Sequence, residues 1–189
     1  GSYWTLLEFR QWTYFKYKKK QKKYCLVAKN LAHVSETFKE DRSFKKVTVF
    51  VKSEGRFYGK QTDLQTALFS LFGLIMATSS CSHLHIFKTM ARFHLPFSSY
   101  EETVVRSLGT YLLGEYIKQQ DDPQHAIGLE GLSAKYAQIA LLNQGIIERI
   151  RALKGADATQ NAVIVLDSFA SLLPMEIDSG LAEIKQLFK

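Results

Sequence analysis

The sequence LEGLSAKYAQIALLNQGIIERIRAL, residues 129–153, repeats its apolar side chains at alternating steps of three and four residues. Such steps place side chains on one face of an α-helix, so this stretch predicts a long amphipathic helix. Asn143 is the single polar member of the face, and Gly155 is typical of a residue that follows a helix. The members of the face are Leu129, Leu132, Tyr136, Ile139, Asn143, Ile146, Ile150 and Leu153.

Two shorter apolar stripes with helical spacing follow this helix. One covers residues 163–173 and the other residues 177–188, and Pro174 separates them. We therefore expect three helices at the C-terminal end that pack on one another within the chain. The face that contains Asn143 also suits a homodimer, because a polar residue in an apolar seam sets the register of paired helices.

Two more helices are predicted upstream, each from an N-terminal capping signal. Residues 62–65, Thr-Asp-Leu-Gln, fit a capping box and open an apolar helix that is expected to end near Thr78. Residues 99–102, Ser-Tyr-Glu-Glu, fit a second box. The helix that follows is expected to reach about Gln120, since the Asp-Asp-Pro sequence that ends at Pro123 would stop it.

The N-terminal third carries the strand signals. Residues 46–52 alternate, with three valines on one face, and residues 56–60 return after a Ser-Glu-Gly turn, which predicts a β-hairpin. Residues 3–17 are rich in aromatic and β-forming side chains and predict a third strand, while residues 26–38 have helical spacing. These elements predict an α+β fold with a small antiparallel sheet that the later helices cover on one face.

Size and charge complete this expectation. The chain of 189 residues suits a single domain with a basic, strand-containing part over 1–60 and a helical part over 61–189. The net charge is +7, with fifteen Lys and Arg against five Asp and Glu in the first part, and ten against thirteen in the second. The N-terminal part is therefore the place where an anionic partner would bind.

Six lysines lie within residues 16–23, next to several aromatic side chains. Lysines neutralise phosphates and tyrosines stack on bases, so this segment predicts binding of an anionic partner, either nucleic acid or an acidic protein surface. The alternative is a solvated connection whose lysines keep a sheet edge from aggregating. The candidate residues are Lys16, Tyr17, Lys18, Lys19, Lys20, Lys22 and Lys23.

Several functional classes find no support in the sequence. Two cysteines cannot form a disulfide framework, and the longest apolar stretch is shorter than a membrane span, so we expect a cytoplasmic protein without a transmembrane segment. The sequence holds no Gly-x-Ser-x-Gly, no phosphate-binding glycine loop and no His-Glu-x-x-His. We therefore expect a non-enzymatic binding or assembly module, without a cofactor unless a metal is bound.

Cys81, the string Met-Ala-Arg-Phe-His-Leu-Pro-Phe at residues 90–97 and the Glu-Glu-Thr at residues 101–103 resemble an uncharacterised bacterial family. The resemblance extends over most of the chain and implies a single α+β domain, with no established activity. It also implies an N-terminal pattern of Cys-Pro motifs whose four thiolates would suit a structural zinc. Here only Cys25 and Cys81 remain, so the resemblance implies that this chain has lost part of that site.

The residues themselves offer a second route to a metal. Cys81, His83 and His85 occupy alternate positions and would face one way on an extended segment, where a thiolate and two imidazoles suit zinc or copper. On a helix only Cys81 and His85 would share a face. With Cys25 these residues form the candidate metal site, and the alternative is that they are ordinary capping and surface residues.

Arg92, His94 and Ser99 form the candidate ligand site. The free amides at the start of a helix attract anions, and Arg92 would add positive charge, so a small-molecule sensor or enzyme with an anion site is the third hypothesis. The alternative is structural: the residues around His94 fix the entry of the chain into the helix, and Arg92 pairs with Glu101 or Glu102.

Overall fold

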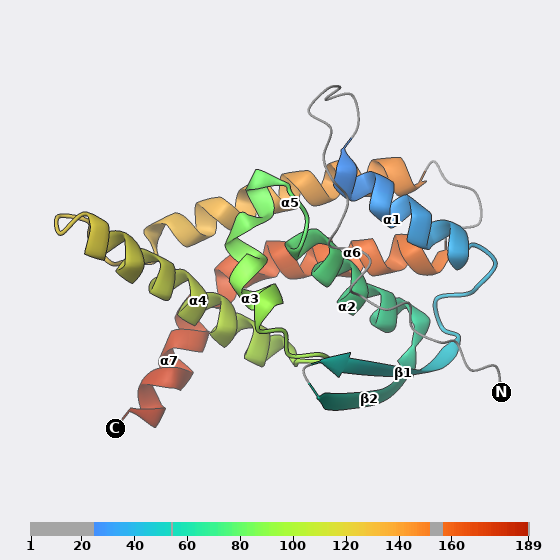
Figure 1. Cartoon of the computed structure of the whole chain (residues 1–189), viewed down its shortest axis with the longest axis horizontal. Helices are drawn as coiled ribbons and strands as arrows, with labels where there is room; N and C mark the ends of the chain where they lie inside the picture. The colour runs from blue at the N-terminus through green and yellow to red at the C-terminus, as the bar shows by residue number, and fades with distance from the viewer. Residues whose placement is uncertain (1–24, 54, 152–156, 189) are drawn as a thin grey trace.

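The computed structural model describes residues 25–53, 55–151 and 157–188, and over these ranges the chain has an α+β fold (Figure 1). The predicted strand over residues 3–17 and the lysine segment lie outside the described residues. The α-helices are α1 (Leu26–Thr37), α2 (Leu64–Ala77), α3 (Lys88–Arg92), α4 (Tyr100–Asp121), α5 (Glu130–Arg151), α6 (Asp157–Leu172) and α7 (Ile177–Leu187). The other elements are the strands β1 (Lys46–Ser53) and β2 (Arg56–Asp63) and the 3₁₀ helices η2 (Ser82–Phe87) and η3 (Leu173–Glu176).

The predicted hairpin is confirmed. β1 and β2 pair antiparallel from Lys46 opposite Asp63 to Ser53 opposite Arg56, and Gly55 takes a φ of 81° in the turn. The three valines of β1 are half-buried, and Phe50 on the other face is 59% exposed. The hairpin lies along one edge of the molecule, against α2 (Figure 1), so helices cover one of its faces.

The start of α2 corrects the predicted capping box. Asp63, and not Thr62, is the N-cap: its side chain accepts a hydrogen bond from the backbone N–H of Thr66 at 2.9 Å. The strand pairing continues through Asp63, opposite Lys46, so the helix begins only at Leu64 and Thr62 lies one position before the N-cap. The helix therefore begins directly where β2 ends. Its predicted end near Thr78 is confirmed, because Thr78 is the C-cap.

The second capping box is confirmed. Ser99 Oγ accepts the backbone N–H of Glu102 at 3.2 Å, and Glu102 Oε2 accepts the backbone N–H of Ser99 at 2.7 Å. These bonds satisfy two amides that an uncapped helix would leave without partners. The residues just before the cap include Phe97, whose φ of 61° is rare for a bulky side chain.

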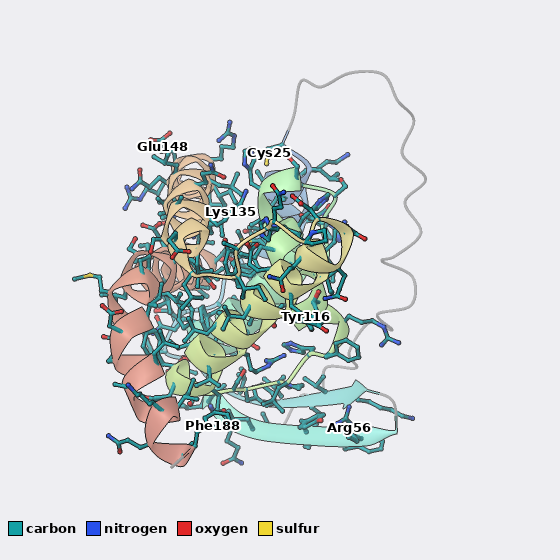
Figure 2. All side chains as sticks on the ribbon, turned by 90° about the vertical axis from the view of Figure 1, so that its left-hand side faces the viewer. Cys25, Arg56, Tyr116, Lys135, Glu148 and Phe188 are labelled. Carbon is teal, nitrogen blue, oxygen red and sulfur yellow. The ribbon has the colours of Figure 1, made fainter. Side chains whose placement is uncertain are left out.

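The C-terminal section consists of three helices, as predicted. On α5 the face that contains Asn143 is buried from Leu132 to Ile150, and α5 and α6 lie side by side. The third stripe begins at Ile177, which is buried on α7. Phe188 does not belong to it: α7 ends one residue earlier, and the ring is 87% exposed at the end of the helix (Figure 2).

One hydrophobic cluster connects the helices of the described ranges. Leu31 of α1, Phe72 of α2, Leu132 of α5 and Ala162 of α6 are all fully buried within it. In these ranges no single helix is both long and apolar enough to cross a membrane, and the segments 64–77 and 82–92 pass that test only as a pair bent by 110°. The helices thus surround a common core, and the cavity described next lies among them.

Candidate ligand-binding site

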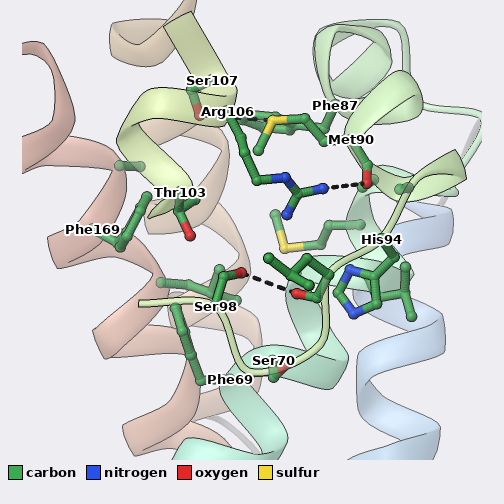
Figure 3. Close-up of a pocket in the computed structure, with 18 of the residues that line it drawn as sticks. Phe69, Ser70, Phe87, Met90, His94, Ser98, Thr103, Arg106, Ser107 and Phe169 are labelled. Atoms are coloured by element: carbon green, nitrogen blue, oxygen red, sulfur yellow. Dashed lines mark hydrogen bonds between the residues drawn. The ribbon is translucent and has the colours of Figure 1, made fainter. Parts of the chain in front are cut away.

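A cavity of about 200 Å³ is bounded by α2, the segment η2–α3, α4, α5 and α6 (Figure 3). Most of the side chains that line it are apolar. The titratable ones are Lys60, His94, Arg106 and Tyr136. The volume is below the range of roughly 300–1,000 Å³ that holds drug-sized ligands, so the cavity suits a smaller molecule.

Arg106 is the charged group of the cavity wall. It projects from α4, and its Nη2 donates hydrogen bonds to the backbone oxygens of Met90 at 3.2 Å, shown in Figure 3, and of Phe93 at 2.7 Å. Both oxygens belong to the C-terminal end of α3, where carbonyl groups lack helical partners and attract a cation. These bonds fix the guanidinium beside the cavity, because they hold one of its three nitrogens.

Among the described residues no Asp or Glu oxygen lies within ion-pair distance of the Arg106 guanidinium. Burial lowers the pKa of Arg106, and the charge of Glu102 partly opposes this change. An arginine nevertheless stays protonated in proteins, so a partly buried cation remains at the cavity.

His94 lies beside Arg106 in the cavity lining (Figure 3). Burial lowers the pKa of His94, and the nearby charge of Arg106 lowers it further. Both effects disfavour the imidazolium, so the ring is neutral at pH 7. A neutral imidazole can donate or accept a hydrogen bond, and it can take up a proton when an anion arrives.

A short hydrogen-bond chain crosses from α5 to α3. The hydroxyl of Tyr136 donates to Ser107 Oγ at 2.9 Å, and Ser107 Oγ donates to the sulfur of Met90 at 3.6 Å. Burial raises the pKa of Tyr136 to about 12, so its phenol is neutral at physiological pH. The chain ties the cavity wall together without adding charge.

Lys60 of β2 is the second cation that lines the cavity. Its ammonium nitrogen lies 5.9 Å from the centre of the Phe97 ring, a cation–π distance. The positive φ of Phe97 turns the chain at this point. The hairpin therefore contributes to the cavity through one lysine, next to the strained residue.

The structure separates the three residues of the predicted anion site. His94 lines the cavity, whereas Arg92 is exposed on α3, with its guanidinium 5.6 Å from the centre of the Phe93 ring. Ser99 is used by the capping box, and its neighbour Ser98 lines the cavity instead. The site therefore has one of its predicted residues, and its cation is Arg106.

The helical spacing of α4 carries a signal for Arg106. Thr103, Arg106 and Ser107 follow one another at steps of three and one, so they share a face of the helix. All three line the cavity. The sequence pattern that identifies Arg106 as a cavity residue is a cation between two hydroxyl residues, on a helix whose neighbouring Val104 is buried.

The candidate metal residues lie at separate helix starts. Cys25 and Cys81 are the N-cap residues of α1 and η2, each half-buried against the core, and His83 and His85 are exposed on η2. Figure 2 shows Cys25 at the opposite end of the molecule from Arg56 at the hairpin tip. Within the described ranges no three His, Cys, Asp or Glu side chains form a group that could hold a metal ion. The zinc hypothesis stays a prediction.

Comparison with known proteins gives the family and no activity. No curated protein and no solved structure matches the chain. One family model matches residues 1–189, and its description is Domain of unknown function (DUF6901). The chain, with its hairpin, its helical core and the cavity beside Arg106, belongs to this family.

Proposed function

We propose that this chain binds a small, mainly apolar molecule that carries a carboxylate or a similar anionic group. The observation behind the proposal is the partly buried guanidinium of Arg106 in the wall of an apolar cavity, without a carboxylate partner among the described residues. Binding would place the anionic group of the ligand against Arg106 and its apolar part among the side chains of α2, α5 and α6.

The physical basis is the cost of a partly buried charge that has no carboxylate partner among the described residues. A guanidinium has five N–H groups, and Arg106 uses its Nη2 for the carbonyls of Met90 and Phe93. An anion that reaches the remaining N–H groups gains charge-assisted hydrogen bonds, which are about twice as strong as neutral ones. Apolar lining with a few convergent polar groups is the usual anatomy of a small-molecule site.

His94 and Lys60 also favour a negatively charged group in the ligand. Both line the cavity, and both can carry a positive charge, so an anion meets no repulsion from the titratable side chains of this wall. The hydroxyl of Tyr136 already donates to Ser107 Oγ, and the hydroxyl of Ser107 donates to the sulfur of Met90, so neither proton is offered to a ligand. Arg106 is therefore the anchor, and the other groups adjust the affinity.

The test is calorimetric titration of the full chain with octanoate and cinnamate, together with their uncharged amides. We expect the acids to bind and the amides to bind at least about tenfold more weakly, as the loss of a charge-assisted hydrogen bond implies. Arg106→Gln should abolish the difference between acid and amide, and Arg92→Gln should keep it, since Arg92 does not line the cavity. Equal binding of acids and amides would refute the proposal.

The lysine segment favours a second candidate function. Six lysines within residues 16–23, interleaved with tyrosines, suit contact with nucleic acid or an acidic protein surface. This segment lies outside the described residues, so the proposal rests on the sequence. Its test is the salt dependence of nucleic-acid binding before and after Lys18, Lys19, Lys20, Lys22 and Lys23 are changed to Glu. Failure to retard any nucleic acid at low salt would remove that partner.

A further inference from the structure

Aromatic rings surround the cavity. They come from five segments: Phe69 of α2, Phe87 of η2, Phe97 of the α3–α4 connection, Tyr136 of α5 and Phe169 of α6. Figure 3 shows Phe69, Phe87 and Phe169 on different ribbons around the cavity. Met76 and Met90 add two thioethers, which make favourable contacts with ring edges. A flat ring inside the cavity would therefore meet aromatic or sulfur atoms on several sides.

Contacts between these rings hold them at an angle to one another. The ring centres of Phe87 and Tyr136 lie 5.7 Å apart, with an angle of 65° between the ring planes. Those of Phe69 and Phe169 lie 6.2 Å apart, with an angle of 46°. Phe169 is also held by Tyr100, with 4.9 Å between the ring centres and an angle of 72°. Aromatic rings attract one another in edge-to-face and offset arrangements, so fixed, non-parallel rings offer both edges and faces to a ligand ring.

The size and the charge of the cavity narrow the ligand further. The cavity volume of about 200 Å³ lies below the roughly 300–1,000 Å³ of sites for drug-sized ligands. It suits a small ligand, such as one ring with a short acidic arm. Arg106 and His94 both line the cavity, and Arg106 projects from α4, so the acidic arm is expected on the α4 side.

We infer that the ligand is an aromatic monocarboxylate, with one ring and a short linker to its carboxylate. The inference rests on the proposed function, because it assumes the anion at Arg106 and adds the chemical class of the apolar part. Its ring packs among the five aromatic residues, and its carboxylate accepts hydrogen bonds from the guanidinium of Arg106. An alkyl carboxylate of similar size would fill the same space without the attraction between rings.

The experiment compares cinnamate with octanoate, two monocarboxylates of similar size, by calorimetric titration of the full chain. We expect cinnamate to bind about tenfold more tightly, since several ring contacts of the usual strength act together. Protons of bound cinnamate should also move upfield in the NMR spectrum, because they lie over the faces of aromatic rings. Equal or tighter binding of octanoate, with both acids lost in Arg106→Gln, would overturn the aromatic class and leave the proposed function standing. If neither acid binds the folded chain, both proposals fail.

Ring variants locate the preference. Phe87→Leu and Phe169→Leu should each reduce the preference for cinnamate at least about threefold, as removal of one ring partner implies. Phe44→Leu is the matched control, because Phe44 is 74% exposed and does not line the cavity. If Phe87→Leu fails to fold, Phe169→Leu and the comparison of the two acids on the unchanged chain still test the preference for an aromatic ligand. A preference that persists unchanged in a folded Phe87→Leu or Phe169→Leu variant would overturn the inference.

Discussion

In the first turns of α4, the guanidinium of Arg106 meets backbone carbonyls and a neutral histidine, whereas two turns from its end the carboxylate of Glu115 is held by two side chains. Glu115 accepts hydrogen bonds from Lys118 Nζ at 2.5 Å and from His125 Nε2 at 2.8 Å. Its side chain is 9% exposed, whereas Lys118 is 60% exposed and His125 31%, so the carboxylate is buried and its partners lie nearer to the surface. One helix thus carries a charge with ion-pair partners and a charge that has none among the described residues.

The difference separates a structural role from a binding role. A buried charge with partners stabilises the fold only modestly, but removal of one of its bonded groups is costly. A partly buried charge without a carboxylate partner costs free energy in the empty protein, and an incoming anion recovers it. We therefore expect substitutions near Glu115 to change stability, and substitutions near Arg106 to change ligand binding.

Glu115→Ala tests this expectation with the largest effect on stability. The substitution removes two charge-assisted hydrogen bonds at a buried position, so the free energy of unfolding should fall by about 2 kcal/mol. Cinnamate and octanoate should bind the folded variant as they bind the unchanged chain, because Glu115 does not line the cavity. Urea denaturation and calorimetric titration measure the two quantities.

Two controls accompany Glu115→Ala. Lys118→Ala removes a partner that is 60% exposed, so it should cost only about 0.5 kcal/mol. Arg106→Gln should change stability by less than about 1 kcal/mol, because it removes two hydrogen bonds together with a charge that has no ion-pair partner among the described residues. A loss of stability in Arg106→Gln as large as that in Glu115→Ala would erase the contrast between the two ends of α4.

Acid should lower the stability that Glu115 contributes near the end of α4. The hydrogen bond from Lys118 is the largest cause that lowers the pKa of Glu115, with burial acting against it and His125 adding to it. The unfolded chain therefore takes up this proton first, and stability from Glu115 is lost as the pH falls from about 4.5 through the lowered pKa. In Glu115→Gln the loss of stability below pH 4.5 should be smaller than in the unchanged chain, as measured by urea denaturation at a series of pH values.

The fold was predictable where short segments decide it. The valine alternation over residues 46–52 and the Ser99–Glu102 box both depend on side chains within a few positions of one another, and both are confirmed. The box at Thr62 was misplaced by one residue because hairpin pairing, a contact across the strands, continues through Asp63 and delays the start of the helix to Leu64. Local patterns found the elements, and long-range pairing decided a boundary.

The site was predictable only in part, for a related reason. Arg92, His94 and Ser99 were grouped because they are close in sequence, and His94 does line the cavity. The chain reverses after α3, so that Arg106, thirteen residues beyond Phe93, lies against its carbonyl. The spacing of residues within one helix does not predict where the chain reverses between two helices. The aromatic lining comes from five segments, so it too could not be predicted from neighbouring residues.

Asn143→Leu extends the comparison to a neutral polar group. Asn143 lines the cavity, is 1% exposed and has no partner for its Oδ1 among the described residues, and its Nδ2 contacts the backbone oxygen of Leu166 at a long 3.5 Å. Replacement by an apolar side chain of similar size removes an unsatisfied group, so stability should rise by about 1 kcal/mol. Thr159→Val is the matched control, because Thr159 Oγ1 is also buried without a partner but lies away from the cavity. A loss of stability in Asn143→Leu alone would mean that Oδ1 has a partner in solution.

The smallest expected effect concerns His94. Its pKa is lowered by burial and by Arg106, so the unfolded chain binds this proton first and the empty protein loses stability as the pH falls below about 6.5. The negative charge of a carboxylate bound beside the ring favours the imidazolium and raises the pKa again. Ligand binding therefore takes up protons, and the affinity for cinnamate should increase about threefold between pH 8 and pH 6, while the ligand itself stays ionised.

His94→Gln separates this effect from other titrations. Glutamine keeps a hydrogen-bonding side chain but cannot gain a charge, so the affinity of the variant should be flat between pH 8 and pH 6. Glu115→Gln should retain the full dependence, because Glu115 titrates below this range and does not line the cavity. If affinity instead weakened as the pH fell, the carboxylate would not lie next to His94. Arg106 would then hold the ligand from the side of the guanidinium that faces away from the imidazole.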